Sequence, residues 1–282
     1  MQMIMFLHQL LLILLFLHLL EPPVQVLLHP LREEHVNHID RFCIFVMGRA
    51  NAGKTTILQR LCNSMDQPEI FDGNGRKHGD HRIEYELAFK SDPHYVFHDS
   101  CGFEAGSEEQ FNMKKFVIDH ANMPKLEKWI HAIWFCILLS EGHRMITIAE
   151  RNFFDECDTG HVPVIVLLMK AGTLEVEAIQ EMEEQQLGVN EEIAAIEQRM
   201  LDENLVKVKR WLNELRFPPH DFLPLRGKCS TIAMIWMQQE GADCIDLLKC
   251  TVNALKEESL QMLLISTQQS SIALCIEFAI KS

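Results

Sequence analysis

The sequence contains no C-x-x-C pair, and its nine cysteines follow no regular spacing. Closely paired cysteines mark many structural zinc sites and redox motifs, so we expect neither here. Several of the cysteines, such as Cys43, Cys136 and Cys275, lie inside apolar runs, where a buried free thiol is expected. The sequence therefore predicts a cytoplasmic, reducing environment without a disulfide framework. Internal repeats and low-complexity tracts are also absent from the sequence, which excludes a solenoid architecture.

Basic residues are scarce, with 26 Lys and Arg against 40 Asp and Glu and a formal net charge of −14. A chain this acidic does not bind nucleic acid or anionic lipid through bulk electrostatics, and we expect no nucleic-acid partner. Hydrophobic residues make up 48% and charged residues 23%, a balance that excludes wholesale disorder. The length of 282 residues fits one large domain or two small ones.

Residues 1–20 are almost entirely apolar and carry no charge. A helix of about 20 residues is just long enough to cross a bilayer. The segment lacks the basic start and small-residue cleavage site of a secretory signal, since the first basic residue is Arg32. Three interpretations stay open. The segment is a membrane anchor with the rest of the chain cytoplasmic, or a cleaved signal peptide, or else either a helix packed on the domain or a non-native start to the chain. Residues 1–40 are therefore expected to form an N-terminal extension.

From Arg41 onward, strand patterns alternate with helix patterns. Apolar runs and alternating stretches predict strands over 42–47, 83–89, 95–99, 131–139, 162–168 and 221–225. Apolar residues at helical spacing predict helices over 55–62, 107–120, 144–157, 173–215 with a break near Gly188, 242–254 and 257–280. Residues 63–80, rich in Asp, Gly, Asn and His, are expected to form a loop. The alternation predicts one α/β domain over 41–282, a three-layer sheet with helices on both faces and further C-terminal helices from about residue 240.

The segment after the first predicted strand fits the phosphate-binding pattern G-x-x-x-x-G-K-[ST]. Its glycines would let backbone N–H groups point at phosphates, and the following helix would add its positive N-terminal end. Lys54 would reach the β- and γ-phosphates, and the Thr55 hydroxyl would ligate Mg²⁺. The alternative is a glycine turn with a surface lysine. The candidate nucleotide-binding residues here are Gly48, Arg49, Ala50, Asn51, Ala52, Gly53, Lys54, Thr55 and Thr56.

A second motif, Asp99-Ser-Cys-Gly102, ends a predicted strand. Asp99 would hold Mg²⁺, through water, and the Gly102 N–H would contact the γ-phosphate. A lone D-x-x-G is a weak signal, but its position 44 residues after Thr55 strengthens it.

Together these motifs resemble those of small P-loop GTPases of the Era/TrmE/HSR1-like group. The chain is most similar to the G-domain proteins found in many copies in fungi. The resemblance covers about Arg41 to the end, and the matching stretches are Arg49–Thr56, Phe97–Glu104, Pro68–Phe71, His131–Trp134 and Leu260–Leu264. It implies a GTPase-like fold that binds GTP and GDP with Mg²⁺.

The resemblance assigns roles to two further residues of the motifs. An asparagine at the place of Asn51 helps Era- and TrmE-like proteins hold a monovalent cation, usually K⁺, although Asn51 would also suit a turn. Phe103 stands where many GTPases place the glutamine that orients water, so intrinsic hydrolysis is expected to be slow. No general base can be named.

The chain departs from the family pattern at two places. No threonine lies between Thr56 and Asp99, where the second GTPase motif needs one. Met169-Lys170-Ala171-Gly172 stands in place of [NT]-K-x-D, so Lys170 can lie along a base but Gly172 lacks the guanine-binding carboxylate.

We therefore expect a GTP-binding protein with slow or partner-dependent hydrolysis. A degenerate G domain that acts as an interaction scaffold, and nucleotide binding without guanine selectivity, are the alternatives. A protein partner or a nucleotide-dependent dimer is also compatible with the sequence. The acidic stretch from Glu175 to Glu197 is either a solvated helix face or a partner-docking helix.

Overall fold

The computed structural model describes residues 40–80, 82–100, 107–139, 145–169, 174–185, 191–225 and 242–267. The expectations for residues 1–39, and for the last part of the helix predicted over 257–280, fall outside these ranges. The described helices and strands belong to one compact unit that begins at Arg41. None of the helices in these ranges is long and apolar enough to cross a membrane.

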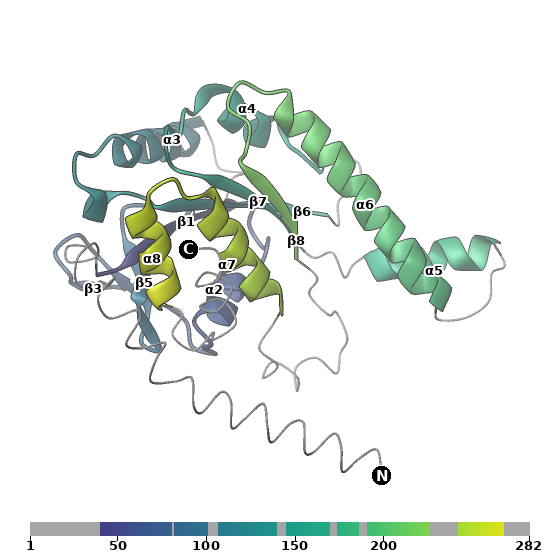
Figure 1. The fold of residues 1–282 in the computed structure, drawn as a ribbon, viewed down its shortest axis with the longest axis horizontal. Helices are drawn as coiled ribbons and strands as arrows, with labels where there is room; N and C mark the ends of the chain where they lie inside the picture. The colour runs from purple at the N-terminus through teal and green to yellow at the C-terminus, as the bar shows by residue number, and fades with distance from the viewer. Residues whose placement is uncertain are drawn as a thin grey trace, which may run out of the picture. The chain divides into compact units, whose positions relative to one another are not determined.

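An eight-stranded sheet in the order β3-β2-β4-β5-β1-β6-β7-β8 forms the centre of the described chain (Figure 1). Five neighbouring strands are parallel: β5 (Asp92–Asp99), β1 (Phe42–Gly48), β6 (Ala132–Leu138), β7 (Val164–Met169) and β8 (Asp221–Pro224). The strands β4 (Glu86–Phe89), β2 (Glu69–Phe71) and β3 (Lys77–His78) extend the sheet in antiparallel fashion.

Continuous apolar sequence explains the central strands. Every residue of β6 and β7 is buried, as are six of the seven residues of β1. Strands in the middle of a parallel sheet are covered on both faces, so they carry apolar side chains at every position rather than at alternate ones. The strands predicted in these three regions are confirmed.

Near the antiparallel edge, one prediction is wrong and another is confirmed only in part. The expected loop over 63–80 contains β2 and β3, which are joined by a turn in which Asp72 Oδ1 accepts the N–H groups of Asn74 and Arg76 at 2.9 Å. The strand predicted over 83–89 begins only at Glu86, because the Tyr85 N–H closes a turn onto the Arg82 carbonyl. Strands of two and three residues are too short to show a period in the sequence.

Helices cover both faces of the sheet. On one face, apolar side chains of β1, β6 and β7 share a core with α3 (Ser107–Ala121), α4 (Ile148–Glu156) and α6 (Glu191–Asn213). Side chains alternate across a strand, so Trp134 lies on the opposite face from the core residues Ile133 and Phe135.

On that opposite face, the Trp134 indole N–H donates to Thr251 Oγ1 of α7 (Ala242–Ala254) at 3.2 Å. Figure 1 shows α7 in front of the sheet with α2 (Lys54–Leu61) and α8 (Glu258–Thr267), and both of these contact β1. The helix α5 (Leu174–Gln185) packs on α6, where Arg199 pairs with Glu181.

The three-layer α/β architecture predicted from the sequence is confirmed. The phosphate-loop sequence lies between the central strand β1 and the helix α2, as in P-loop proteins. The helix predicted to start at residue 144 begins four residues later, at Ile148. Thr147 and Glu150 form a capping box that fixes this start.

Candidate nucleotide-binding site

Glycine geometry shapes the phosphate loop. Gly48 ends β1 with a φ of +145°, and a Cβ atom there would lie 2.5 Å from the Cys136 carbonyl oxygen of β6. Gly53 has a φ of +93° and caps α2 without a side chain. Both conformations favour glycine, so the two fixed glycines of the motif are explained by backbone geometry. The loop between them curls back at the carboxyl end of the central strand.

Asn51 lies at the exposed tip of this loop with a φ of +59°. Asparagine tolerates the left-handed region better than other non-glycine residues. Its backbone conformation therefore explains the residue type without an ion, and the K⁺ role stays a prediction. Among its neighbours, Ala52 is buried, whereas Ala50 and Thr56 are exposed and Thr55 is partly exposed.

Lys54 lies folded under the loop, with only 8% of its surface exposed. Its Nζ atom donates to the carbonyl oxygens of Gly48 and Arg49, both at 3.1 Å. The same Nζ atom is 3.7 Å from Oδ1 of Asp99. The ammonium group is thus fixed at the start of α2 by backbone carbonyls and a carboxylate, which excludes the alternative of a free surface lysine.

Asp99 reaches the loop because its strand is in register with β1. Asp99 pairs with Val46 across the two parallel strands, and the Gly48 N–H donates to Ser100 Oγ at 3.3 Å. Burial raises the pKa of the Asp99 carboxyl to about 6, and the nearby Lys54 opposes this rise. At neutral pH the group is mainly ionised, and a cation placed beside it would favour that form.

The oxygen atoms of Thr55 and Asp99 suit Mg²⁺, which prefers hard oxygen ligands. In the described ranges no three His, Cys, Asp or Glu side chains gather to hold a metal by themselves. Mg²⁺ in nucleotide sites commonly takes one or two protein ligands together with phosphate and water. The residues present therefore fit the ion.

The side chain of Arg49 is engaged away from any phosphate. It is 2% exposed, and its Nε atom donates to Oε1 of Glu150, a fully buried residue of α4, at 3.0 Å. Arg49 was expected among the nucleotide-binding residues, and its backbone does lie in the loop. Sequence reasoning missed Glu150 as its partner. The T-x-x-E pattern from Thr147 to Glu150 is the signal that could have marked the helix start.

Four sequence-predicted positions lie outside the described residues: Gly102, Phe103, Lys170 and Gly172. The expected contacts of the Gly102 N–H with a γ-phosphate and of Lys170 with a base therefore remain predictions.

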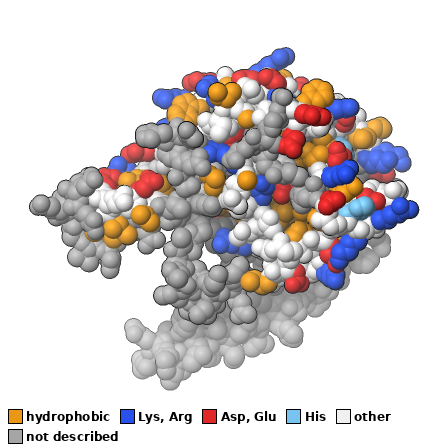
Figure 2. All heavy atoms as spheres, turned by 180° about the vertical axis from the view of Figure 1, so that it is seen from behind, with side chains coloured by type: hydrophobic (Ala, Val, Ile, Leu, Met, Phe, Trp, Pro, Cys, Tyr) orange, Lys and Arg blue, Asp and Glu red, His pale blue; other side chains and the backbone are white. Residues whose placement is uncertain are grey.

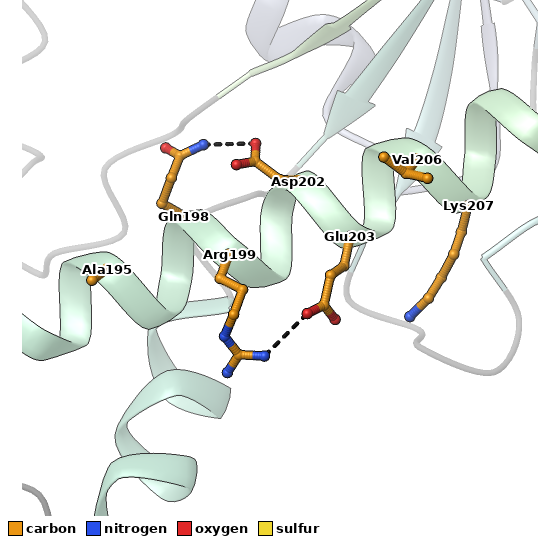
Figure 3. A pocket seen from close by; sticks show the side chains of 7 residues that line it. All are labelled: Ala195, Gln198, Arg199, Asp202, Glu203, Val206 and Lys207. Carbon is orange, nitrogen blue, oxygen red and sulfur yellow. Dashed lines mark hydrogen bonds and ion pairs between the residues drawn. The ribbon is translucent and has the colours of Figure 1, made fainter.

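A shallow hollow on another element does not compete with the loop as a site. Figure 3 shows the hollow on α6, lined by Ala195, Gln198, Arg199, Asp202, Glu203, Val206 and Lys207. Gln198 donates to Asp202 at 2.8 Å, and Arg199 donates to Glu203 at 3.1 Å. These groups satisfy one another along the helix, as is typical of a solvated face. The predicted partner-docking role of the acidic stretch stays untested.

Charges of both signs are interspersed on the face that Figure 2 shows. Among the described side chains visible there, Lys and Arg alternate with Asp and Glu rather than forming one basic field.

No protein-family model matches the chain, and no curated protein matches it. Among solved structures, a GTP-binding protein from Sulfolobus solfataricus in complex with GDP is similar at 15% identity and a TM-score of 0.34, over 75% of this chain and 53% of that protein. A variant of Era from Aquifex aeolicus bound to GDP and AlF4− is similar at 16% identity and a TM-score of 0.39, over 78% of this chain and 58% of that one.

The septin GTPase domain of Chlamydomonas reinhardtii is similar at 14% identity and a TM-score of 0.37, over 72% of this chain and 71% of that one. The chain thus spans just over half the length of the Sulfolobus and Aquifex proteins. Likeness at this level identifies no family, so any ligand must be inferred from the loop residues of this chain.

Proposed function

We propose that the chain binds a nucleoside triphosphate, GTP by its sequence resemblance, through the loop from Gly48 to Thr56, in complex with Mg²⁺. The position of Lys54 is the observation that carries this proposal. Its buried ammonium is held by the Gly48 and Arg49 carbonyls beside Asp99, at the N-terminus of α2. A positive group fixed where a helix presents unpaired N–H groups is suited to a polyphosphate.

Each part of the loop has a role in the bound state that we propose. Backbone N–H groups of the loop and of the first turn of α2 bind the phosphates. Lys54 contacts the β- and γ-phosphates, and Thr55 and Asp99 hold Mg²⁺, Asp99 through water. When bound, the ion offsets charge on the phosphate oxygens. The Gly102 N–H and the Lys170 stem complete the site at the γ-phosphate and at the base.

If the nucleotide is hydrolysed, the γ-phosphoryl group passes to water. Catalysis would then depend on positioning and on charge stabilisation by Lys54, the loop N–H groups and Mg²⁺. Phe103 cannot orient a water by hydrogen bonding, so hydrolysis is slow or requires a partner. A K⁺ ion beside Asn51 is the candidate for a further positive charge.

Gly172 favours a second candidate, nucleotide binding without guanine selectivity. The aspartate expected there in the sequence pattern would accept two charge-assisted hydrogen bonds, worth roughly 1.5–3 kcal/mol each. Without it, GTP and ATP would bind with similar affinity. The remaining alternative is a scaffold that does not hydrolyse nucleotide, formed by a single domain over 41–282. Such a scaffold could be anchored by residues 1–20, or it could bind a protein partner or a second copy of the chain.

Titration of the full chain with GTP, ATP, GDP and ADP, each with Mg²⁺, tests this function. We expect a triphosphate to bind with a Kd below ~100 μM, and Lys54→Ala to abolish that binding. Lys125→Ala is the matched control, since its side chain is 67% exposed and distant in sequence from the loop. Failure of both triphosphates to bind below this concentration would contradict the proposal.

The same titration also tests base selection, and a separate assay of the hydrolysis rate tests ion dependence. Equal affinities for GTP and ATP would support the loss of guanine selectivity at Gly172. Faster hydrolysis in K⁺ than in Na⁺ would support the ion role of Asn51, and equal rates in the two salts would exclude it.

A further inference from the structure

Arg49 joins the phosphate loop to the start of a helix that lies 101 residues later in the chain. Its guanidinium donates from Nε to Glu150 Oε1 at 3.0 Å and from Nη2 to the Met145 carbonyl at 2.6 Å. Neither side chain is accessible, with 3% of the Arg49 side chain and none of the Glu150 side chain exposed. The contact is therefore a buried ion pair with a further hydrogen bond, which the loop motif itself does not require.

Glu150 serves two structures at once. Its Oε2 atom accepts the Thr147 N–H at 2.6 Å and the Thr147 hydroxyl at 3.0 Å, which caps the N-terminus of α4. Its Oε1 atom accepts the Arg49 Nε–H. One carboxylate thus fixes the first turn of α4 and the side chain that leaves the phosphate loop.

The backbone of Arg49 extends this connection to the binding lysine. The Arg49 carbonyl accepts a hydrogen bond from Lys54 Nζ at 3.1 Å and another from the Ala52 N–H at 3.3 Å. Rotation of the peptide group that contains the Arg49 carbonyl would therefore displace both hydrogen bonds. A side chain held by two buried acceptors resists such rotation, because breaking a buried ion pair leaves an uncompensated charge.

We propose that Arg49 is a positioning residue that fixes the phosphate loop to α4, so that Glu150 helps to place the ammonium of Lys54 for a polyphosphate. This inference rests on the proposed nucleotide-binding function. It makes affinity depend on a carboxylate that contacts no nucleotide. It also assigns the segment from Met145 to Glu150 as the place from which a change could reach the loop.

Three variants of the full chain separate positioning from stability. Arg49→Met removes the ion pair with Glu150 and the hydrogen bond to the Met145 carbonyl, and leaves the Glu150 charge buried. Arg49→Met with Glu150→Gln removes both charges while the amide oxygen can still accept from Thr147, so stability should largely return. Arg49→Lys keeps the charge but cannot reproduce the forked contact. Lys114→Met is the matched control, because Lys114 of α3 forms an ion pair with Glu156, at the end of α4 opposite to Glu150.

Three quantities are measured for each variant: the melting temperature, the Kd for Mg²⁺–GTP at a temperature below the melting temperature of every variant, and the amide hydrogen exchange of Ala52 in nucleotide-free protein. We expect Arg49→Met and the double variant both to bind about tenfold more weakly or worse, with faster exchange at Ala52, and Arg49→Lys to fall between. The control should stay within about twofold of the wild type in both measurements.

Recovery of affinity together with stability in the double variant would overturn the proposal, since a purely structural pair predicts that the two recover together. Unchanged exchange at Ala52 in Arg49→Met would also overturn it. If the wild-type chain binds no triphosphate, the proposed function fails, whereas the exchange measurement still decides whether Arg49 fixes the loop.

Discussion

Gly48 lies where the phosphate loop leaves the sheet, and Gly48→Ala should destabilise the protein strongly. A Cβ atom would lie 2.5 Å from the Cys136 carbonyl oxygen and 2.9 Å from Cys136 Cβ, and the φ of +145° is unsuited to alanine. Overpacking of a core costs about 1–3 kcal/mol, and an unfavourable backbone region adds about 1–3 kcal/mol. We expect a loss of about 3 kcal/mol in the free energy of unfolding.

Thermal and urea denaturation measure this loss. For a domain of this size, about 3 kcal/mol lowers the melting temperature by roughly 6–12 °C. Gly79→Ala is the matched control, because a Cβ there meets nothing within 4 Å and the change should have little effect. Cys136→Gly should not rescue Gly48→Ala, since the closest contact is with a backbone oxygen. A Gly48→Ala protein as stable as the Gly79→Ala control would refute the close approach of β1 and β6.

Two further predictions concern buried polar groups. His131 accepts the Cys43 N–H at Nδ1 and donates from Nε2 to the Leu126 carbonyl, both at 3.0 Å, and burial lowers its pKa from 6.5 to about 4. Since the unfolded chain takes up the proton first, the free energy of unfolding should fall as the pH drops from 6.5 towards 4, by up to roughly 3 kcal/mol. In urea denaturation, His131→Asn should depend less steeply on pH over this range. Equal pH dependence in the wild type and the variant would contradict this role of His131. Thr251→Val leaves the Trp134 indole N–H without its acceptor and should cost about 1–3 kcal/mol, whereas an unchanged denaturation midpoint would show that this hydrogen bond contributes nothing.

The sequence was sufficient to predict the parts of the fold that depend on local pattern. The continuous apolar runs of β1, β6 and β7 identify strands covered on both faces, and the motif from Gly48 to Thr55 identifies the loop between strand and helix. The short strands β2 and β3 have no readable period, so they were missed.

The contacts that fix the loop depend on residues far apart in the chain. Arg49 and Glu150 are 101 residues apart, and nothing in the spacing of either motif indicates that they meet. The close approach of Gly48 to Cys136 likewise follows from the pairing of β1 with β6, which is a tertiary contact between strands far apart in the chain. By contrast, Asp99 could be placed near Lys54 because Asp99 ends β5 and Lys54 follows the carboxyl end of the adjacent parallel strand β1.

The affinity of the full chain for Mg²⁺–GTP, compared with that of Lys54→Ala by isothermal titration calorimetry, tests the central claim most directly. The buried Lys54 ammonium, held by the Gly48 and Arg49 carbonyls, predicts a Kd below ~100 μM for the wild type and at least about a hundredfold weaker binding for the variant. Equal affinity of the wild type and Lys54→Ala for Mg²⁺–GTP would contradict the assignment of this loop as a phosphate site. The absence of triphosphate binding by either protein would contradict it as well.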